Sequence, residues 1–119
     1  LYLDQAFIAG IGNYLRAEIL HKAGLHPDRR PADLGRGELG RLARATLSIS
    51  LRSYDTGGIT NPPRRVKALQ RQNLPRENTR FAVFGRAGLP CYDCGDEIQR
   101  IEANSRRLYY CRVCQPLTP

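Results

Sequence analysis

The N-terminal part of the chain carries apolar residues at the spacing of an α-helix. Within residues 1–9, apolar positions 3, 7 and 8 share one helical face. The run Gly10-Ile11-Gly12-Asn13 interrupts this pattern and predicts a tight turn, after which the Asn13 side chain can cap a second helix. The apolar stripe of that second helix consists of Leu15, Ile19, Leu20 and Ala23. Gly24 is predicted to end it as a C-cap.

A third helix is predicted after a proline-containing loop. Residues 25–35 include Pro27 and Pro31 and several charges, which favours a loop. Residues that can form one buried face then recur with helical period from position 38 to position 50, and the helix is expected to end near Gly57-Gly58. Residues 59–78 contain three prolines and five basic residues, so a basic connector with short helical turns is predicted there.

The last third of the chain changes to short extended segments. Residues 81–84, 98–101 and 107–110 are predicted strands, with turns at 85–88 and 104–105. The expected fold class is therefore mainly α with a small β appendage. We divide the chain into a helical domain at 1–58, a connector at 59–80 and a β-hairpin domain at 81–119.

All four cysteines lie in this last segment as two C-x2-C pairs, Cys91 with Cys94 and Cys111 with Cys114, separated by sixteen residues. This spacing is typical of structural zinc sites, in which four thiolates at about 2.3 Å surround one ion and leave no open position. We predict one structural Zn²⁺. Two disulfides or a redox C-x2-C pair are the alternatives, disfavoured because the sequence shows neither a secretory signal nor a thioredoxin-like strand and helix pattern.

The charge of the chain indicates a nucleic-acid partner. The formal net charge is +8 and the pI is near 9.9, with the larger share of the excess in residues 51–119. Seventeen of the nineteen basic residues are Arg, whose planar fork suits phosphate oxygens. A GC-rich genome explains the preference for Arg equally well, but it does not explain the net charge.

Length and termini suggest a piece of a longer protein. The chain begins at Leu1 inside a helical pattern and contains no methionine, so we expect a fragment. No run approaches the roughly 18 apolar residues of a membrane span, and no signal peptide is recognisable. A cytoplasmic, nucleoid-associated bacterial protein that is monomeric and has no membrane partner is the expectation.

Two features together identify a family resemblance. The segment 3–20, LDQAFIAGIGNYLRAEIL, combined with the C-terminal four-cysteine hairpin, closely resembles the formamidopyrimidine-DNA glycosylase and endonuclease VIII family over nearly the whole chain. The resemblance implies a helix-two-turn-helix bundle followed by a zinc β-hairpin. Tyr14-Leu15-Arg16 resembles the endonuclease VIII branch, which implies a preference for oxidised pyrimidines.

In that family the two parts clamp double-stranded DNA that contains damaged bases or abasic sites. The resemblance implies that Asn13 and Arg106 hold phosphates beside the flipped-out nucleotide. Gly12 would let the backbone approach a phosphate closely. Arg107 is the neighbour that could take the place of Arg106, which is defined by its position five residues before Cys111.

Enzymes of this family attack the sugar with an N-terminal proline assisted by an adjacent glutamate. The resemblance therefore implies that the parent is a bifunctional DNA N-glycosylase and AP lyase that acts in base excision repair. This chain starts with Leu1, so we expect it to bind DNA but to be inactive alone, with no catalytic residue and with Arg106 as a candidate contributor.

Two other functions stay open. Helix-two-turn-helix elements also occur in a small-subunit ribosomal protein and in an archaeal-type topoisomerase, so a non-catalytic nucleic-acid-binding zinc module is the main alternative. A zinc-bearing protein-interaction domain is the other. His21 and His26 have no cysteine or carboxylate partner at ligand spacing and are predicted surface residues. The tyrosines near the cysteines are predicted to pack the hairpin and not to stack on bases: Tyr92, Tyr109 and Tyr110.

Overall fold

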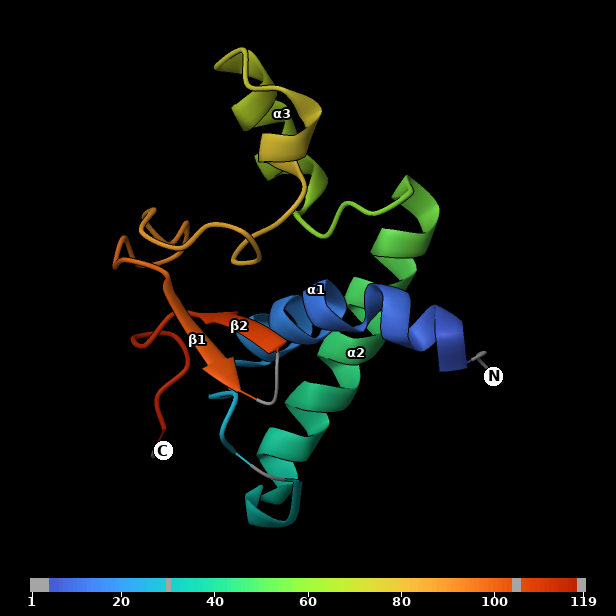
Figure 1. Cartoon of the computed structure of the whole chain (residues 1–119), viewed down its shortest axis with the longest axis vertical. Helices are drawn as coiled ribbons and strands as arrows, with labels where there is room; N and C mark the ends of the chain where they lie inside the picture. Colours follow the sequence, from blue (N-terminus) through green and yellow to red (C-terminus); the bar gives the residue numbers. More distant parts are fainter. Residues whose placement is uncertain (1–4, 30, 104–105, 118–119) are drawn as a thin grey trace.

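The computed structural model describes residues 5–29, 31–103 and 106–117, and helices dominate it (Figure 1). In chain order its elements are α1 (Gln5–Ala23), the 3-10 helix η1 (Pro31–Asp33), α2 (Arg36–Thr56), α3 (Pro63–Arg71), the 3-10 helix η2 (Arg76–Thr79), β1 (Gln99–Ala103) and β2 (Arg106–Tyr110). Three α-helices and one two-stranded sheet in these residues confirm the predicted class, mainly α with a small β appendage.

Helix α1 is continuous across the segment whose glycines predict a turn. The prediction of two helices separated at Gly10-Ile11-Gly12-Asn13 is wrong, because the helix runs from Gln5 to Ala23 without a break, and Asn13 is not an N-cap. A glycine in a helix interior costs about 1 kcal/mol relative to alanine, but it keeps the backbone donor that a proline would remove. Burial of the C-terminal half of α1, where Ala17 and Ala23 are in the core, stabilises the helix against this cost.

Glycines in the left-handed conformation end α1 and α2, as predicted. Gly24 has φ of +72°, and its N–H donates to the His21 carbonyl at 3.1 Å. A Cβ at Gly24 would lie 3.3 Å from the Cys114 carbonyl oxygen. A glycine at this position therefore also lets the backbone at Cys114 come close to the end of α1. Gly57 has φ of +71° at the end of α2, which confirms the predicted end of that helix.

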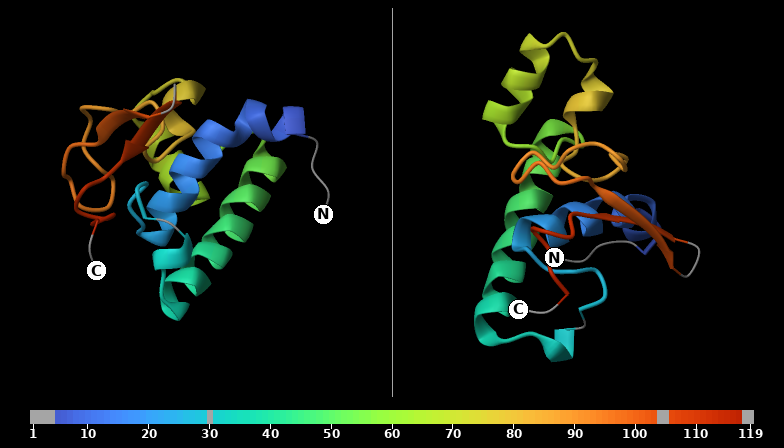
Figure 2. Two further views of the ribbon diagram at one scale, coloured as in Figure 1. Left: turned by 60° about the horizontal axis from the view of Figure 1, so that its bottom comes forward. Right: turned by 90° about the vertical axis from the view of Figure 1, so that its left-hand side faces the viewer.

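Helices α1 and α2 pack against each other at an angle, and the hairpin lies against α1 (Figure 2). The buried face of α2 consists of Ala45, Ile49 and Ser53, spaced four residues apart as one helical face requires. The first turn of α2 is closed by Glu38, whose carboxylate accepts the Gly35 N–H at 2.9 Å.

The predicted connector contains α3, a regular helix that starts with Pro63, where a missing N–H has no cost.

The segment before the cysteines is not extended. Residues 81–84 form bends and turns, so the predicted strand there is wrong. Their backbone donors bind a carboxylate of α1, as described below, instead of a neighbouring strand. Strands β1 and β2 do form the predicted antiparallel hairpin, with Ile101 opposite Leu108 and Ala103 opposite Arg106.

Among the residues whose burial the structure describes, two apolar clusters make up the core, and α1 contributes to both. The first consists of Ala17, Val83, Cys91, Ile98, Tyr109 and Cys111. The second consists of Ala23, Leu25 and Ala45, with Ile19, Leu20, Leu34 and Leu42 packed on it. Helix α1 therefore connects the cysteine segment with α2. Within the described residues, no helix combines the length and the apolar character that crossing a membrane requires.

Candidate metal centre and nucleic-acid interface

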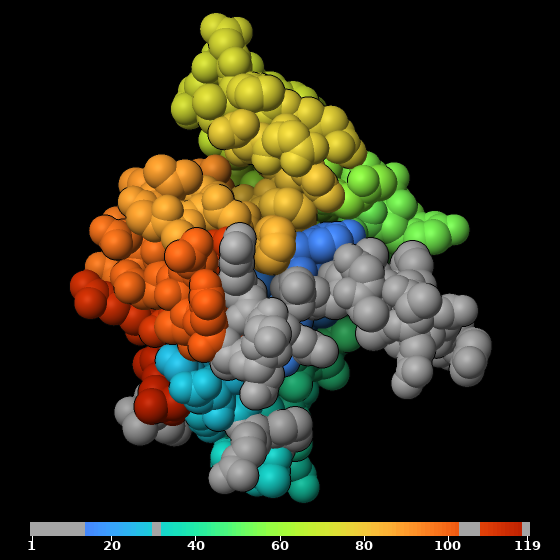
Figure 3. Space-filling view, in the orientation of Figure 1, coloured from blue at the N-terminus to red at the C-terminus, as the bar shows by residue number. Residues whose placement is uncertain are grey.

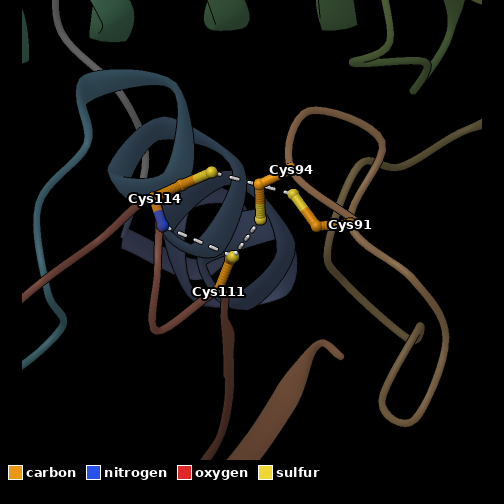
Figure 4. A group of neighbouring side chains, drawn as sticks. All are labelled: Cys91, Cys94, Cys111 and Cys114. Atoms are coloured by element: carbon orange, nitrogen blue, oxygen red, sulfur yellow. Dashed lines mark hydrogen bonds between the residues drawn. The ribbon is translucent and has the colours of Figure 1, made fainter. Parts of the chain in front are cut away.

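The four cysteine sulfurs converge on one point (Figure 4). The Sγ atoms of Cys91 and Cys114 are 3.8 Å apart, those of Cys94 and Cys111 are 3.4 Å apart, and all four lie within 4.8 Å of one another. A tetrahedral ion with metal–sulfur bonds of about 2.3 Å separates its sulfurs by about 3.8 Å. None of the four forms a disulfide, because these separations are well above the S–S bond length of about 2.05 Å, and the geometry fits a site for one metal ion.

Local backbone hydrogen bonds turn each C-x2-C pair back on itself. The Gly95 N–H donates to the Cys91 carbonyl at 2.9 Å, and the Gln115 N–H donates to the Cys111 carbonyl at 2.8 Å. Backbone N–H groups also donate to sulfur at 3.4 Å, from Asp96 to Cys94 and from Cys114 to Cys111. These donors favour thiolates, which are the form that binds a metal.

Burial and hydrogen bonding act on the thiols in opposite directions. The Asp96 N–H lowers the pKa of Cys94, which is exposed. Burial raises the pKa of Cys111 and of Cys114 above its usual value. A bound cation reverses the effect of burial because it stabilises the charged sulfur directly. A bound cation would therefore be needed to keep the two buried sulfurs, those of Cys111 and Cys114, as thiolates.

Gln115 joins the second cysteine pair to the loop that follows α1. Its side chain is fully buried; Oε1 accepts the Cys111 N–H at 2.9 Å and Nε2 donates to the Leu25 carbonyl at 2.8 Å. Sequence reasoning missed this residue, since no local pattern distinguishes a buried glutamine from an exposed one. Its role in joining the two segments is seen only from its contact with Leu25, ninety residues earlier in the chain.

The two histidines are buried, so the prediction that they are surface residues is wrong. His21 is 8% exposed and its Nε2 lies 3.6 Å from the Cys91 Sγ and 3.8 Å from Asp93 Oδ2. Burial lowers the pKa of His21. His26 packs edge-on against the Tyr110 ring at 4.8 Å between centroids. Spacing along the chain could not predict these partners, because the end of α1 meets residues about seventy positions later.

The tyrosines near the cysteines contact side chains of the protein itself. The Tyr109 ring lies 5.1 Å from that of Phe84, between centroids. Tyr92 stacks with two guanidinium groups, at 3.8 Å from Arg86 and 4.8 Å from Arg65. Arg65 also donates to Asp93 Oδ1 at 2.9 Å. This ion pair joins α3 to the turn between Cys91 and Cys94.

A buried carboxylate fastens α1 to the segment that precedes the cysteines. Glu18 is 2% exposed and accepts hydrogen bonds from the Thr60 hydroxyl and from three successive backbone N–H groups, those of Ala82 at 2.7 Å, Val83 at 2.8 Å and Phe84 at 3.1 Å. Successive donors that converge in this way form a concave anion site. Here the protein's own carboxylate fills it.

This assembly can be compared with known proteins. No family model matches the chain. It is 43% identical over 115 residues to Endonuclease 8 of Enterobacter sp. (strain 638), a match that covers 97% of this chain and 40% of that protein. Endonuclease 8 of Shigella sonnei matches with the same identity and coverage. The chain is related to the C-terminal region of the formamidopyrimidine-DNA glycosylase and endonuclease VIII family. It spans about 40% of the length of these curated relatives.

Solved structures of this family have the same fold. The MutM (Fpg) protein of Thermus thermophilus is 35% identical, with a TM-score of 0.71, and the match covers 91% of this chain and 40% of that one. Lactococcus lactis Fpg in complex with DNA containing an abasic site is 26% identical, with a TM-score of 0.67, over 87% of this chain and 36% of that one. The family resemblance inferred from residues 3–20 and the cysteines is therefore confirmed.

The residues that the family resemblance assigns to DNA binding lie on α1 and at the end of the hairpin. Gly12 and Asn13 are in α1, and Arg106 is the first residue of β2, followed by Arg107. Arg106 pairs with Ala103 in the last register of the hairpin, so its backbone lies at the tip. The side chains of Asn13, Arg106 and Arg107 are outside the described part of the structure.

Helix α3 carries an exposed basic face that the sequence predicts only as a basic connector. Arg64, Lys67 and Arg71 are exposed and recur at helical spacing. The region of α3 and η2, yellow in Figure 3, projects from the rest of the described molecule. This helix is a second candidate surface for phosphate contact in an endonuclease VIII relative.

Proposed function

We propose that this chain is the DNA-binding part of a base-excision-repair DNA glycosylase and that it holds one structural Zn²⁺. The observation that carries the proposal is the 43% identity to Endonuclease 8 over 97% of the chain. The fold match to Lactococcus lactis Fpg in complex with abasic-site DNA supports a damaged duplex as the partner. Its parent would be a bifunctional N-glycosylase and AP lyase that removes oxidised bases, with pyrimidines preferred.

The chemistry of the four-cysteine cluster fits zinc in a structural role. Four thiolates complete a tetrahedron, so no position is open for a substrate. Cys91 and Cys111 are buried in the core, and Cys111 directly follows β2. A two-stranded hairpin has too little apolar surface to be stable alone, and a bound ion would supply the missing free energy, on the order of 10 kcal/mol in small zinc sites.

DNA contact would come from three places on the surface. Asn13 on α1 and Arg106 at the hairpin tip would hold phosphates beside the flipped-out nucleotide, with Gly12 and Arg107 next to them. The exposed basic face of α3 would contact the backbone farther along the duplex. The net charge of +8 supports binding driven by release of counterions from the phosphates.

The experiment that tests this function compares duplexes with the zinc-loaded chain. Fluorescence anisotropy would measure binding to a duplex with a central abasic-site analogue and to the same duplex intact. Tighter binding of the abasic-site duplex is expected, because kinking costs less where stacking is already broken. Equal affinity for both would favour the non-catalytic nucleic-acid module. Borohydride trapping should give no covalent complex, since we propose that the chain alone is inactive.

A further inference from the structure

The four-thiol cluster shares one edge with a second group of metal-binding side chains. Nε2 of His21, Sγ of Cys91, Oδ2 of Asp93 and Sγ of Cys114 also lie within 4.8 Å of one another. The two groups have Cys91 and Cys114 in common, and these sulfurs are 3.8 Å apart. His21 and Asp93 are therefore within reach of an ion that keeps Cys91 and Cys114 as ligands.

The donors of the second group suit the same ion. Imidazole, carboxylate and thiolate are all ligands of zinc, at about 2.0 Å for nitrogen and about 2.3 Å for sulfur, which gives a tetrahedral N···S separation of about 3.5 Å. The His21 Nε2 lies 3.6 Å from the Cys91 Sγ. His21 is 8% exposed, so its ring is buried where it meets Cys91.

Asp93 is oriented for such a role by its other contacts. Arg65 donates to its Oδ1 at 2.9 Å, while Oδ2 points toward His21 at 3.8 Å. The Asp93 N–H donates to the Cys91 Sγ at 3.4 Å, which links the carboxylate to the shared edge. A hydrogen-bonded partner that fixes a ligating carboxylate is the usual second layer of a metal site.

We propose that His21 and Asp93 are reserve ligands that keep the metal ion when Cys94 is lost as a ligand. The ion then moves across the edge between Cys91 and Cys114 into the group that contains His21 and Asp93. With four thiolates bound, His21 instead donates its Nε2–H to the Cys91 sulfur. Cys94 is the ligand most open to loss, because its thiol is exposed whereas Cys111 is fully buried. The inference rests on the proposed zinc centre.

Substitutions in the 119-residue chain separate the two ligand sets. Cys94→Ser should still bind one Zn²⁺ per chain, about 10- to 100-fold more weakly in competition with a chromogenic chelator. In the Co²⁺ form its thiolate-to-metal absorption should fall by about half, because two thiolates remain of four. Cys91→Ser removes a ligand of both sets and should lose the metal.

Second substitutions in the Cys94→Ser background identify the replacement ligands. Adding His21→Phe should abolish retention of the metal, whereas adding His26→Phe, a matched change at the other buried histidine, should not. Adding Asp93→Asn should weaken binding further. Asp93 has an exposed side chain, so this variant tests the idea without disturbing the core.

Four outcomes would overturn the proposal. Loss of the metal from Cys94→Ser alone would show that no reserve set exists. Equal binding by Cys94→Ser with and without His21→Phe, or equal losses from His21→Phe and His26→Phe, would exclude the histidine as a ligand. Failure of the unsubstituted chain to bind Zn²⁺ or Co²⁺ at all would overturn the zinc centre itself, and the reserve set with it.

Discussion

Replacing Glu18 by glutamine would show how much one buried carboxylate contributes to joining α1 to the segment before the cysteines. The carboxylate accepts from the Thr60 hydroxyl and the Ala82 N–H on one oxygen, and from the N–H groups of Val83 and Phe84 on the other. A carboxylate has only acceptors, so all of these donors are satisfied together. A glutamine amide has one donor end, which must face two other donors whichever way it is oriented.

The expected loss can be worked out from these contacts. The less costly orientation turns the NH₂ toward Thr60 and Ala82, because the Thr60 hydroxyl also reaches the Arg80 carbonyl, at 3.1 Å. The Ala82 N–H then has no acceptor, at a cost of about 1–3 kcal/mol, and the remaining bonds lose their charge-assisted share. We expect Glu18→Gln to lower the free energy of unfolding by about 3 kcal/mol. At an m-value of about 2 kcal/mol/M, the urea midpoint falls by about 1.5 M.

Urea unfolding of the zinc-loaded protein, followed by circular dichroism, measures this change. Glu77→Gln is the matched control, because Glu77 forms an ion pair with Arg80 but its side chain is 72% exposed. Exposed pairs contribute at most about 1 kcal/mol, so the control should unfold close to the unsubstituted protein. Equal midpoints for the two variants would refute the reasoning that Glu18 holds these segments together.

Three further predictions concern the DNA surface and α2. Arg106→Ala should weaken binding to an abasic-site duplex about tenfold with unchanged zinc content, since it removes a charged hydrogen bond. The control is Arg112→Ala, because the Arg112 guanidinium is already paired with Asp96 at 2.9 Å. This control variant should bind normally in the same anisotropy assay. Log affinity for duplex DNA should fall linearly with log salt concentration, and a salt-independent affinity would contradict phosphate contact. The pKa of Glu38 is lowered, first by the Gly35 N–H and then by Arg29, from an ordinary value of 4.5. Its stabilisation is therefore present above that value and lost as the pH falls through the folded-state pKa. The difference in Tm between the unsubstituted protein and Glu38→Gln at neutral pH should therefore disappear once the pH lies well below the folded-state pKa of Glu38.

Features that depend on neighbouring residues could be predicted from the sequence. Gly24 and Gly57 end helices because the left-handed conformation they adopt is a local property of glycine. The C-x2-C pairs predict their own turns and a shared site, because four thiols at this spacing suit one tetrahedral ion. The hairpin between them follows from alternation on both sides of a turn.

Features that depend on distant contacts could not be predicted in this way. Residues 81–84 have the apolar character of a strand, yet their donors bind Glu18, more than sixty positions earlier. Glycines at positions 10 and 12 indicate a turn by their local preference, but α1 continues through them. In each case the contacts of the folded chain outweigh a local preference of about 1 kcal/mol per residue.

The contacts of α1 imply that a metal ion held by the four cysteines would stabilise the helical part as well as the hairpin. Glu18 binds the segment before the cysteines, His21 lies against Cys91, and Leu25, just after the helix, accepts from Gln115. Glu18 and His21 are three residues apart, so they share a face of α1 that is covered by the cysteine segment. Separating α1 from the cysteine segment would break the hydrogen bonds of Glu18 and of the buried Gln115 together. The free energy of binding a metal ion would then stabilise α1 as well as the hairpin. This coupling would hold the hairpin in place relative to α1, and the proposed phosphate clamp, with Asn13 on one and Arg106 on the other, would require that fixed relation.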